Sequence, residues 1–430
     1  MQLSAEQQHA FDSFKQGKNL FITGPGGSGK SALIRLFYEE AQGFSKNIQI
    51  TALTGCAAIL LGCKAKTLHS WAGIGLGTDC IENIIQKVKK NRHKLAQWRE
   101  IDILVIDEVS MLSKHLFELL DDLGKHLRRC PRPFGGIQII VLGDFYQLPP
   151  VTKEGECEFC FESPKWRESF SRDCHIKLVH IFRQTDGEYA TILNQLREGK
   201  IKKKSYTTLL KYVGREIPDS LPVRPTKIFP VRHKVDSINM REMAKLSGDS
   251  ITYSIKHEYV PESGSPRHSM DEVAAEFKYI EKGLMCEEKL VLKRGSQVMC
   301  IVNMELPDGN VLCNGSQGIV TGFCGGSNLP IVKFCGRDVT MPTHAWTSDK
   351  IPGLSVLQIP LILAWAITIH KSQGASLDCA EIDVGADIFE CGQTYVALSR
   401  VKSLDGLYLT SFDISRVFVN ETVRDFYESI

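Results

Sequence analysis

The sequence predicts an α/β fold built on a parallel sheet, and three stretches carry that prediction. Residues 19–23 (NLFIT) form an apolar run long enough for a buried strand, and residues 31–40 (SALIRLFYEE) follow with helical spacing of their apolar side chains. Residues 103–106 (ILVI) and 137–142 (IQIIVL) are two further aliphatic runs, each followed directly by polar residues. Because ligands bind at the carboxyl edge of parallel sheets, we expect these polar residues to share one site.

Composition limits the class of protein. With 430 residues, 43% hydrophobic and 24% charged, the chain has the make-up of a soluble protein of several domains. No apolar run reaches the roughly 18 residues of a membrane helix, so we expect no membrane partner. The start (MQLSAEQQHAFDSFKQG) resembles neither a secretory signal nor a transit peptide, and 14 scattered cysteines favour an intracellular, reducing compartment, either nucleus or cytoplasm.

The stretch between the first strand and helix, GPGGSGKS, matches the pattern G-x-x-x-x-G-K-[ST]. Glycines let successive backbone N–H groups curl around phosphate oxygens, and the helix N-terminus adds partial positive charge. Lys30 is expected to reach the β- and γ-phosphates, and Ser31 to hold Mg²⁺. The predicted nucleotide-binding residues here are Gly24, Gly26, Gly27, Ser28, Gly29, Lys30 and Ser31.

Asp107 and Glu108 directly follow the aliphatic run at residues 103–106. At the carboxyl edge of a parallel sheet, Asp107 can hold the Mg²⁺ shell and Glu108 can orient and deprotonate an attacking water. An Asp-Glu pair alone is often a solvated strand end, but after a phosphate-binding loop it predicts hydrolysis of a nucleoside triphosphate with Mg²⁺.

The next strand delivers GDFYQLPPV (Gly143–Val151), with Asp144 and Gln147, to the same edge. Gln147 lacks charge and can report on the γ-phosphate through a hydrogen bond. TALTGCAA (residues 51–58) has hydroxyls and small residues that suit close approach to a phosphate chain, and TLHSWAGIG (residues 67–75) adds His69 and Trp71, which can stack on bases.

Two arginines lie far from the glycine loop in sequence. Arg400 is in QTYVALSRV, after a stretch at residues 361–378 that ends in TIHKSQGASLD, and Arg183 is in LVHIFRQTD. An arginine that reaches a γ-phosphate from another domain neutralises charge in the transition state. A surface charge is the alternative for each.

The order of these stretches carries a resemblance. In sequence order the motifs are Gln7, the glycine loop, TALTGCAA, IDEVSML, GDFYQLPPV, FRQTDGEYATILNQLREG, TIHKSQG and YVALSRV. The chain resembles superfamily-one DNA helicases in the order of these motifs. The chain looks most similar to the PIF (petite integration frequency) family, a relative of RecD-type helicases, from about Leu3 to about Leu409.

The resemblance implies two RecA-like domains with ATP between them and single-stranded DNA across their tops. It implies an ATP-dependent DNA helicase that moves 5′-to-3′ and unwinds duplex, in DNA replication, recombination or repair. It also implies roles for residues: Gln7 would read the adenine edge, Gln147 would sense the γ-phosphate, and Arg183 and Arg400 would be arginine fingers. Residues expected on the DNA side are Thr54, His69, Trp71, Thr368, His370 and Ser372.

The expected organisation follows the family. Residues 1–178 are the first RecA-like domain, with a small insertion at about 63–75 beside the DNA exit, where Trp71 or a neighbour would wedge the fork; a buried core tryptophan is the alternative. The second RecA-like domain comprises residues 179–288 and 354–430. Short alternating strands with glycines at residues 289–353 predict an insertion similar to an SH3-like β-barrel.

Other clusters stay ambiguous. Residues 81–98 predict a basic helix, and KIKKK (residues 200–204) is a second basic run; a solvated face is expected for each, with phosphate contact as the alternative. The spacing of four residues suggests a zinc site: Cys157, Cys160, Cys174 and His175. Cys174 and His175 are adjacent in sequence, however, which favours ordinary cysteines without a metal.

Two other functions stay open: a DNA-stimulated ATPase or translocase that does not separate strands, and a P-loop NTPase acting on protein. Arg400 lies in the same chain as the glycine loop, which favours a monomer closing on itself. The expected partners are single-stranded and forked DNA; a G-quadruplex or an RNA–DNA hybrid is undecided.

Overall fold

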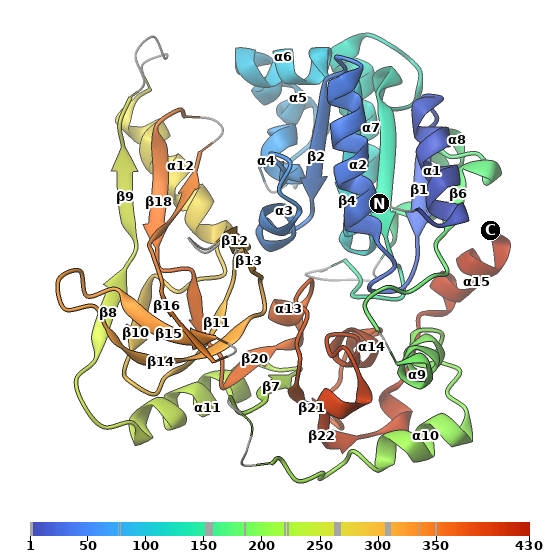
Figure 1. Ribbon diagram of the computed structural model, residues 1–430. Helices are drawn as coiled ribbons and strands as arrows, with labels where there is room; N and C mark the ends of the chain where they lie inside the picture. Colours follow the sequence, from blue (N-terminus) through green and yellow to red (C-terminus); the bar gives the residue numbers. More distant parts are fainter. Residues whose placement is uncertain are drawn as a thin grey trace. The chain divides into compact units, whose positions relative to one another are not determined.

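The computed structural model describes residues 3–75, 77, 79–150, 158–184, 186–218, 221, 223–261, 268–305, 311–334, 336–348 and 351–430. They form two compact units (Figure 1), which we describe separately. The first comprises Met1–Tyr206, Phe389–Ser399 and Ile414–Ile430, and the second Thr207–Ile388 and Arg400–Asp413.

The first unit contains a six-stranded parallel sheet of order β3-β2-β4-β5-β1-β6. Consecutive side chains of β1 point to opposite faces, as the pleat requires: Leu20 and Ile22 enter one core and Phe21 the other. The strands are β1 (Leu20–Thr23), β2 (Ile48–Ala52), β3 (Lys66–Thr67), β4 (Ile103–Asp107), β5 (Gln138–Gly143) and β6 (His175–Lys177). The expected α/β fold with a parallel sheet is therefore present.

Helices cover both faces of this sheet. Figure 1 shows α1 and α2 alongside its strands, and their apolar side chains share one core with those of α3. The other core is lined by α4 to α8 and by α15. The helices of the unit are α1 (Ala5–Lys15), α2 (Lys30–Gly43), α3 (Gly55–Leu61), α4 (Leu68–Ala72), α5 (Ile81–Lys90), α6 (Arg92–Glu100), α7 (Lys114–Arg128), α8 (Pro164–Ser169), α9 (Gly187–Arg197), α14 (Gln393–Leu398) and α15 (Glu421–Ser429), with α10 (Lys203–Leu210) running through its boundary.

Short 3₁₀ turns join several elements. They are η1 (Val109–Met111), η2 (Pro133–Gly136), η3 (Cys160–Glu162), η4 (Arg172–Cys174), η5 (Leu404–Gly406) and η6 (Ile414–Arg416).

The first compact unit extends to Tyr206, and Arg197 of α9 forms a buried ion pair with Asp144 beyond β5. The end of a first RecA-like domain at residue 178 stays a prediction. The single helix expected over residues 81–98 is two helices: Asn91 leaves the helical region (φ −91°, ψ 100°), and its side chain accepts a 3.1 Å hydrogen bond from the backbone N–H of Lys94. Asparagine is among the preferred N-cap residues, so it starts α6 instead of continuing α5.

The second unit contains a four-stranded parallel sheet of order β20-β7-β21-β22. Its strands are β7 (Thr226–Phe229), β20 (Ala366–Thr368), β21 (Ala380–Val384) and β22 (Leu407–Phe412). The helices of this unit are α11 (Arg232–Lys245), α12 (Met270–Gly283) and α13 (Ile369–Ser372).

Antiparallel strands form the rest of the second unit. A five-stranded sheet has the order β16-β15-β14-β11-β19. A three-stranded sheet has β18 between β17 and β9. Two further pairs of strands are β10 with β8 and β12 with β13. The five-stranded sheet includes β19, which follows residue 353, and the insertion expected over residues 289–353 stays a prediction. The strands are β8 (Ile251–Ser254), β9 (Lys256–Tyr259), β10 (Lys289–Leu292), β11 (Gln297–Cys300), β12 (Met304–Glu305), β13 (Val311–Leu312), β14 (Gln317–Phe323), β15 (Pro330–Phe334), β16 (Arg337–Thr340), β17 (His344–Thr347), β18 (Leu354–Gln358) and β19 (Leu361–Leu363).

In the part of the chain that the structure describes, no helix combines the length and the apolar character needed to cross a membrane.

Candidate active site

The glycine loop joins β1 to α2 at the carboxyl edge of the first sheet. Gly29 lies at the N-cap of α2 with φ of 85°, and a Cβ there would come within 2.5 Å of Nε2 of Gln7. A Cβ on Gly24 would come within 2.6 Å of the carbonyl oxygen of Leu178. The glycines are therefore required both by a left-handed backbone and by neighbouring chain that lies against the loop.

Lys30 begins α2 and is surrounded by charges of the same sheet edge. Its ammonium donates hydrogen bonds to the carbonyl oxygens of Gly24 and Pro25, at 2.7 and 3.0 Å. Burial lowers the pKa of Lys30, and the carboxylates of Asp144, Glu108 and Asp107 oppose that shift. The structure thus brings the predicted phosphate-binding lysine next to the predicted carboxylates.

Asp107 ends β4 and is 7% exposed. Burial and the neighbouring Glu108 raise the pKa of Asp107 to about 7, with Lys30 offsetting only part of the shift. A buried carboxylate with incomplete charge compensation is a suitable ligand for a divalent cation, and the exposed hydroxyl-bearing Ser31 in the first turn of α2 is a second oxygen donor. These two residues therefore fit Mg²⁺.

Glu108 has a left-handed backbone, with φ of 56° and ψ of 44°. Non-glycine residues pay roughly 1–2 kcal/mol for this conformation. Such strain is typical of functional sites, where it fixes the direction of a side chain.

Gln147 and Asp144 lie in the turn that follows β5. The backbone N–H of Gln147 donates to the carbonyl of Asp144 at 2.9 Å, and both side chains are buried. A Cβ on Gly392, the N-cap of α14, would approach the carbonyl oxygens of Tyr146 and Gln147 within 2.7 Å. The turn is therefore fixed by the helix that precedes Arg400.

Sequence analysis missed the partner of Asp144. Arg197 of α9 donates two hydrogen bonds of 2.8 Å, from Nε and Nη2, to the two carboxylate oxygens of Asp144. Tyr189, Leu193, Leu196 and Arg197 have the spacing of one helix face, so the amphipathic pattern itself could have placed this arginine in the core.

Tyr427 of α15 is the second residue that was missed. Its hydroxyl shares a 2.6 Å hydrogen bond with Oγ1 of Thr23, accepts one of 3.1 Å from the backbone N–H of Phe145, and lies 3.4 Å from a carboxylate oxygen of Asp144. Its ring stacks on Tyr146 at 4.6 Å. One hydroxyl thus joins the residue before the glycine loop to the turn that carries Gln147.

Residues 178–184 run along the glycine loop. The backbone N–H groups of Leu178 and Phe182 donate to the carbonyls of Thr23 and Gly27, at 2.7 and 2.8 Å. Arg183 comes next, and a Cβ on Gly27 would lie 2.4 Å from the Cβ of Arg183. The predicted finger residue Arg183 is therefore at the loop.

Two polar side chains of this segment lack partners in the described part of the chain. They are Nη1 of Arg183 and both amide atoms of Gln184, a residue 7% exposed. Burial also lowers the pKa of Arg183. Unsatisfied buried donors beside the glycine loop fit an anionic ligand.

Gln7 lies against the same loop. Its Oε1 accepts a 3.0 Å hydrogen bond from the backbone N–H of Ser4, and its Nε2 donates to the carbonyl of Ser28 at 3.3 Å. The amide therefore positions the loop on α1, and recognition of adenine stays a prediction.

Arg400 belongs to the second unit, while α14 directly before it belongs to the first. Within the first unit, the hydroxyl of Tyr395 on α14 accepts a 2.8 Å hydrogen bond from the backbone N–H of Gly26. The finger role of Arg400 stays a prediction.

The expected DNA-side residues of the first unit differ in accessibility. Thr54 accepts a hydrogen bond from the N–H of Ala57 at 3.2 Å, and burial lowers the pKa of His69. Trp71 is 0% exposed and packs on Trp98 with ring centroids 4.6 Å apart. An enclosed ring cannot stack on a base or part a duplex, so the structure contradicts the prediction that Trp71 binds DNA.

In the second unit, Thr368 caps α13 by accepting from the N–H of Lys371 at 3.2 Å, and His370 is exposed. Ser372 is 0% exposed, and its hydroxyl donates to the carbonyl of Ile369 at 2.7 Å. Burial therefore contradicts a direct DNA contact through the side chain of Ser372.

The zinc alternative finds no support in the described residues. Cys157 lies outside them, while Cys160 and Cys174 are buried free thiols. Nε2 of His175 accepts from the indole N–H of Trp166 at 3.2 Å, and its Nδ1 donates to the carbonyl of Ser171 at 2.9 Å. Among the described residues, no three His, Cys, Asp or Glu side chains gather as a metal site requires.

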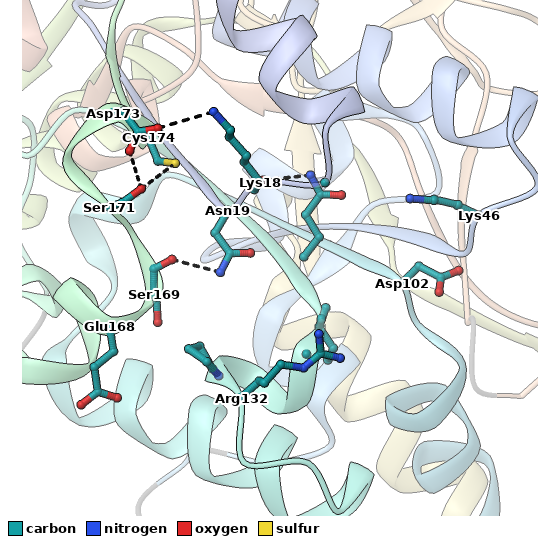
Figure 2. Close-up of a pocket in the computed structure, with 15 residues that line it drawn as sticks. Lys18, Asn19, Lys46, Asp102, Arg132, Glu168, Ser169, Ser171, Asp173 and Cys174 are labelled. Atoms are coloured by element: carbon teal, nitrogen blue, oxygen red, sulfur yellow. Dashed lines mark hydrogen bonds and ion pairs between the residues drawn. The ribbon is translucent and has the colours of Figure 1, made fainter.

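A cavity of about 590 Å³ lies at the opposite, amino-terminal edge of the first sheet. Figure 2 shows its lining, with Lys18 and Asn19 before β1, Asp102 before β4, and Arg132. Lys18 pairs with Asp173 at 3.5 Å, and the amide of Asn19 donates to the carbonyl of Ser169 at 3.0 Å. Its lining includes none of the residues predicted for nucleotide or DNA.

Comparison with known proteins gives a consistent result. Residues 2–207 match the family model "PIF1-like helicase", and residues 279–323 match "DNA helicase Pif1, 2B domain". The chain is 37% identical to the ATP-dependent DNA helicase PIF1 of Danio rerio, over 100% of this chain and 64% of that protein. It is 33% identical to the ATP-dependent DNA helicase Pif1 of Bdellovibrio bacteriovorus, over 100% of this chain and 92% of that protein.

Solved structures agree. The crystal structure of Pif1 helicase from Candida albicans has 35% identity and a TM-score of 0.80, covering 100% of this chain and 99% of that one. Bacteroides Pif1 in complex with ADP-AlF4 has 28% identity and a TM-score of 0.79, and Bacteroides Pif1 bound to ssDNA has 30% and 0.68, each covering 100% of this chain and 97% of that one.

The chain spans 62 to 65% of the length of the PIF1 helicases of Emericella nidulans, Danio rerio and Xenopus laevis. With 33% identity over 92% of the Bdellovibrio protein and the matching fold, the chain belongs to the PIF1-like helicase family.

Proposed function

We propose that this chain is an ATP-dependent DNA helicase that moves 5′-to-3′ on single-stranded DNA and unwinds duplex. The observation that carries the proposal is the convergence of Lys30, Asp107 and Glu108 at one sheet edge. Family relatives named as ATP-dependent DNA helicases, and a relative's complexes with ADP-AlF4 and with single-stranded DNA, support the same assignment.

The residues of the site have distinct roles in this proposal. The loop N–H groups and Lys30 bind the β- and γ-phosphates, and Gln7 holds the loop and reads adenine. Ser31 and Asp107 would hold Mg²⁺, which neutralises charge on the phosphates. Glu108 takes a proton from the attacking water, and Gln147 orients the γ-phosphate by a hydrogen bond.

The architecture has finer proposed features. The two parallel sheets are assigned to two RecA-like domains, and Arg183 and Arg400 act as arginine fingers that stabilise the transition state. The five-stranded sheet is assigned to an SH3-like barrel, and residues 63–75 to a wedge whose tip is a residue other than Trp71. Thr54, His69, Thr368 and His370 are assigned to the DNA track.

Partners and setting belong to the same proposal. The enzyme acts as a monomer on single-stranded and forked DNA, in an intracellular, reducing compartment. G-quadruplexes and RNA–DNA hybrids are further substrates to test by the same assay.

Strand separation on duplexes with a 5′ or a 3′ single-stranded tail tests the proposal. We expect ATP-dependent unwinding only with the 5′ tail, and none with Lys30→Ala, which lacks the phosphate-binding ammonium. Stimulation of ATP hydrolysis by single-stranded DNA without unwinding would favour a translocase instead. No stimulation would remove both DNA functions.

A further inference from the structure

Exposed cations concentrate on two adjoining helices, α5 and α6. Residues 81–100 contain six Lys or Arg and two Glu, a net charge of +4, whereas the whole chain carries +2. The exposed basic side chains, which we name the α5–α6 basic surface, are Lys87, Lys89, Lys90, Arg92, His93 and Arg99.

The core of the first unit holds this surface in place. Ile84, Ile85 and Val88 bury one face of α5, and Trp98 buries α6 against Trp71. Cations on a packed support keep their spacing, so less conformational entropy is lost when they bind an extended anion.

The lysines of α5 lack an acidic partner among the residues that the structure describes. In the described part of the chain, no carboxylate forms an ion pair with Lys87, Lys89 or Lys90. The ammonium of Lys89 lies instead 2.7 Å from Nε2 of His126 on α7, and that of Lys87 lies 3.2 Å from the position of a Cβ on Gly75. Uncompensated like charges repel one another, and a polyanion would remove that repulsion.

The surface offers mostly charge and little aromatic area. Residues 79–100 present no exposed Phe, Tyr or Trp, because Trp98 is buried, and the imidazole of His93 is the one exposed ring among them. Proteins that hold single strands combine cations with exposed aromatic rings, whereas duplex backbones are held by charge alone. The chemistry therefore favours the phosphates of a duplex over a single strand.

Hydrogen bonds tie α6 to α4. Lys94 of α6 donates to the carbonyl of Ser70 at 2.7 Å, and the indole of Trp98 donates to that of Ala72 at 3.0 Å. Both bonds hold α4, which carries His69, one of the residues assigned to the DNA track.

We propose that the α5–α6 basic surface binds the phosphodiester backbone of the duplex arm of a fork. The inference rests on the proposed DNA function and adds a second contact, separate from the single-strand track and from the nucleotide site.

The test removes three charges at each of two places. One variant carries Lys87→Ala, Lys89→Ala and Lys90→Ala; the matched control carries Lys202→Ala, Lys203→Ala and Lys204→Ala, also exposed lysines of the first unit. Binding to a blunt duplex, a fork with a 5′ tail and the tail oligonucleotide alone is measured between about 50 and 200 mM salt. Each lost phosphate contact should lower the slope of log K against log salt by about 0.9.

We expect the α5 variant to bind fork and blunt duplex at least about 10-fold more weakly, with a salt slope lower by about 2 to 3. Its affinity for the single strand and its single-strand-stimulated ATP hydrolysis should match the unmodified chain. Unchanged fork affinity, or an equal loss for the single strand or in the control variant, would overturn the proposal. If the unmodified chain shows no single-strand stimulation, the helicase assignment fails while the duplex measurement still decides this surface.

Discussion

At the residue scale, the site depends on polar groups whose partners lie far away in sequence. The hydroxyl of Tyr427 binds Thr23, which precedes the glycine loop, and the backbone N–H of Phe145, which lies in the turn that carries Gln147. A buried donor left without a partner costs about 1–3 kcal/mol. The same hydroxyl should therefore affect both stability and catalysis.

Tyr427→Phe tests this point. We expect a lower midpoint of thermal unfolding and a several-fold lower kcat for ATP hydrolysis, because the ring still packs but the turn and loop lose their common partner. Thr23→Val removes the other half of the 2.6 Å bond, so the double variant should lose less than the sum of the single losses. A lower midpoint with unchanged kcat would show that Tyr427 is only structural.

Glu108 allows a second prediction at this scale, because its left-handed backbone is strained. Glu108→Gly should abolish hydrolysis yet raise the unfolding midpoint by a few degrees, since glycine adopts this backbone without the roughly 1–2 kcal/mol penalty. Glu108→Gln should abolish hydrolysis without raising the midpoint. Equal midpoints for the two variants would argue against backbone strain.

At the element scale, α9 is tied to β5 by the buried pair of Arg197 and Asp144. Removing one partner of a buried ion pair leaves an uncompensated charge and costs roughly 3–5 kcal/mol. Arg197→Met should therefore destabilise the chain strongly, and Asp144→Asn in the same chain should recover part of that loss. Chemical denaturation of the three variants measures the coupling, and additive losses would contradict it.

Local sequence patterns predicted the glycine loop, β4 and the turn after β5, but they did not predict the distant residues that hydrogen-bond to Asp144. The glycine loop, β4 and the turn after β5 each carry their signal within about ten residues, and all three meet at one sheet edge. Arg197 and Tyr427 bind Asp144 across 53 and 283 positions, a distance that no local pattern spans. Trp71 stayed open between a DNA-contacting ring and a buried core side chain, because an aromatic ring in a short helix has the same local pattern in both cases; the structure shows the buried one.

At the scale of the whole molecule, the chain passes between its two units on both sides of α14. The crossings fall at Ile388–Phe389 and Ser399–Arg400, so α14 contacts the glycine loop through Tyr395 while Arg400 belongs to the other unit.

Arg400→Ala should leave nucleotide binding intact and lower kcat by about 10³-fold or more, as expected for loss of an arginine finger. Fluorescent nucleotide titration and steady-state hydrolysis with single-stranded DNA measure the two effects separately. Arg416→Ala, at an arginine that is not assigned to the site, is the control. Weaker binding with normal turnover at saturation would contradict the finger role.

The docking of α15 has a consequence for biosynthesis. The longest segment of the first unit ends at Tyr206, but the hydroxyl that binds Thr23 and Phe145 belongs to Tyr427, in the last segment of that unit. At roughly 5–20 residues per second, a ribosome needs on the order of 10–40 s to translate the stretch between. During that interval Thr23 and Phe145 lack the hydroxyl of Tyr427, so we expect the glycine loop to reach its final arrangement only after α15 has emerged.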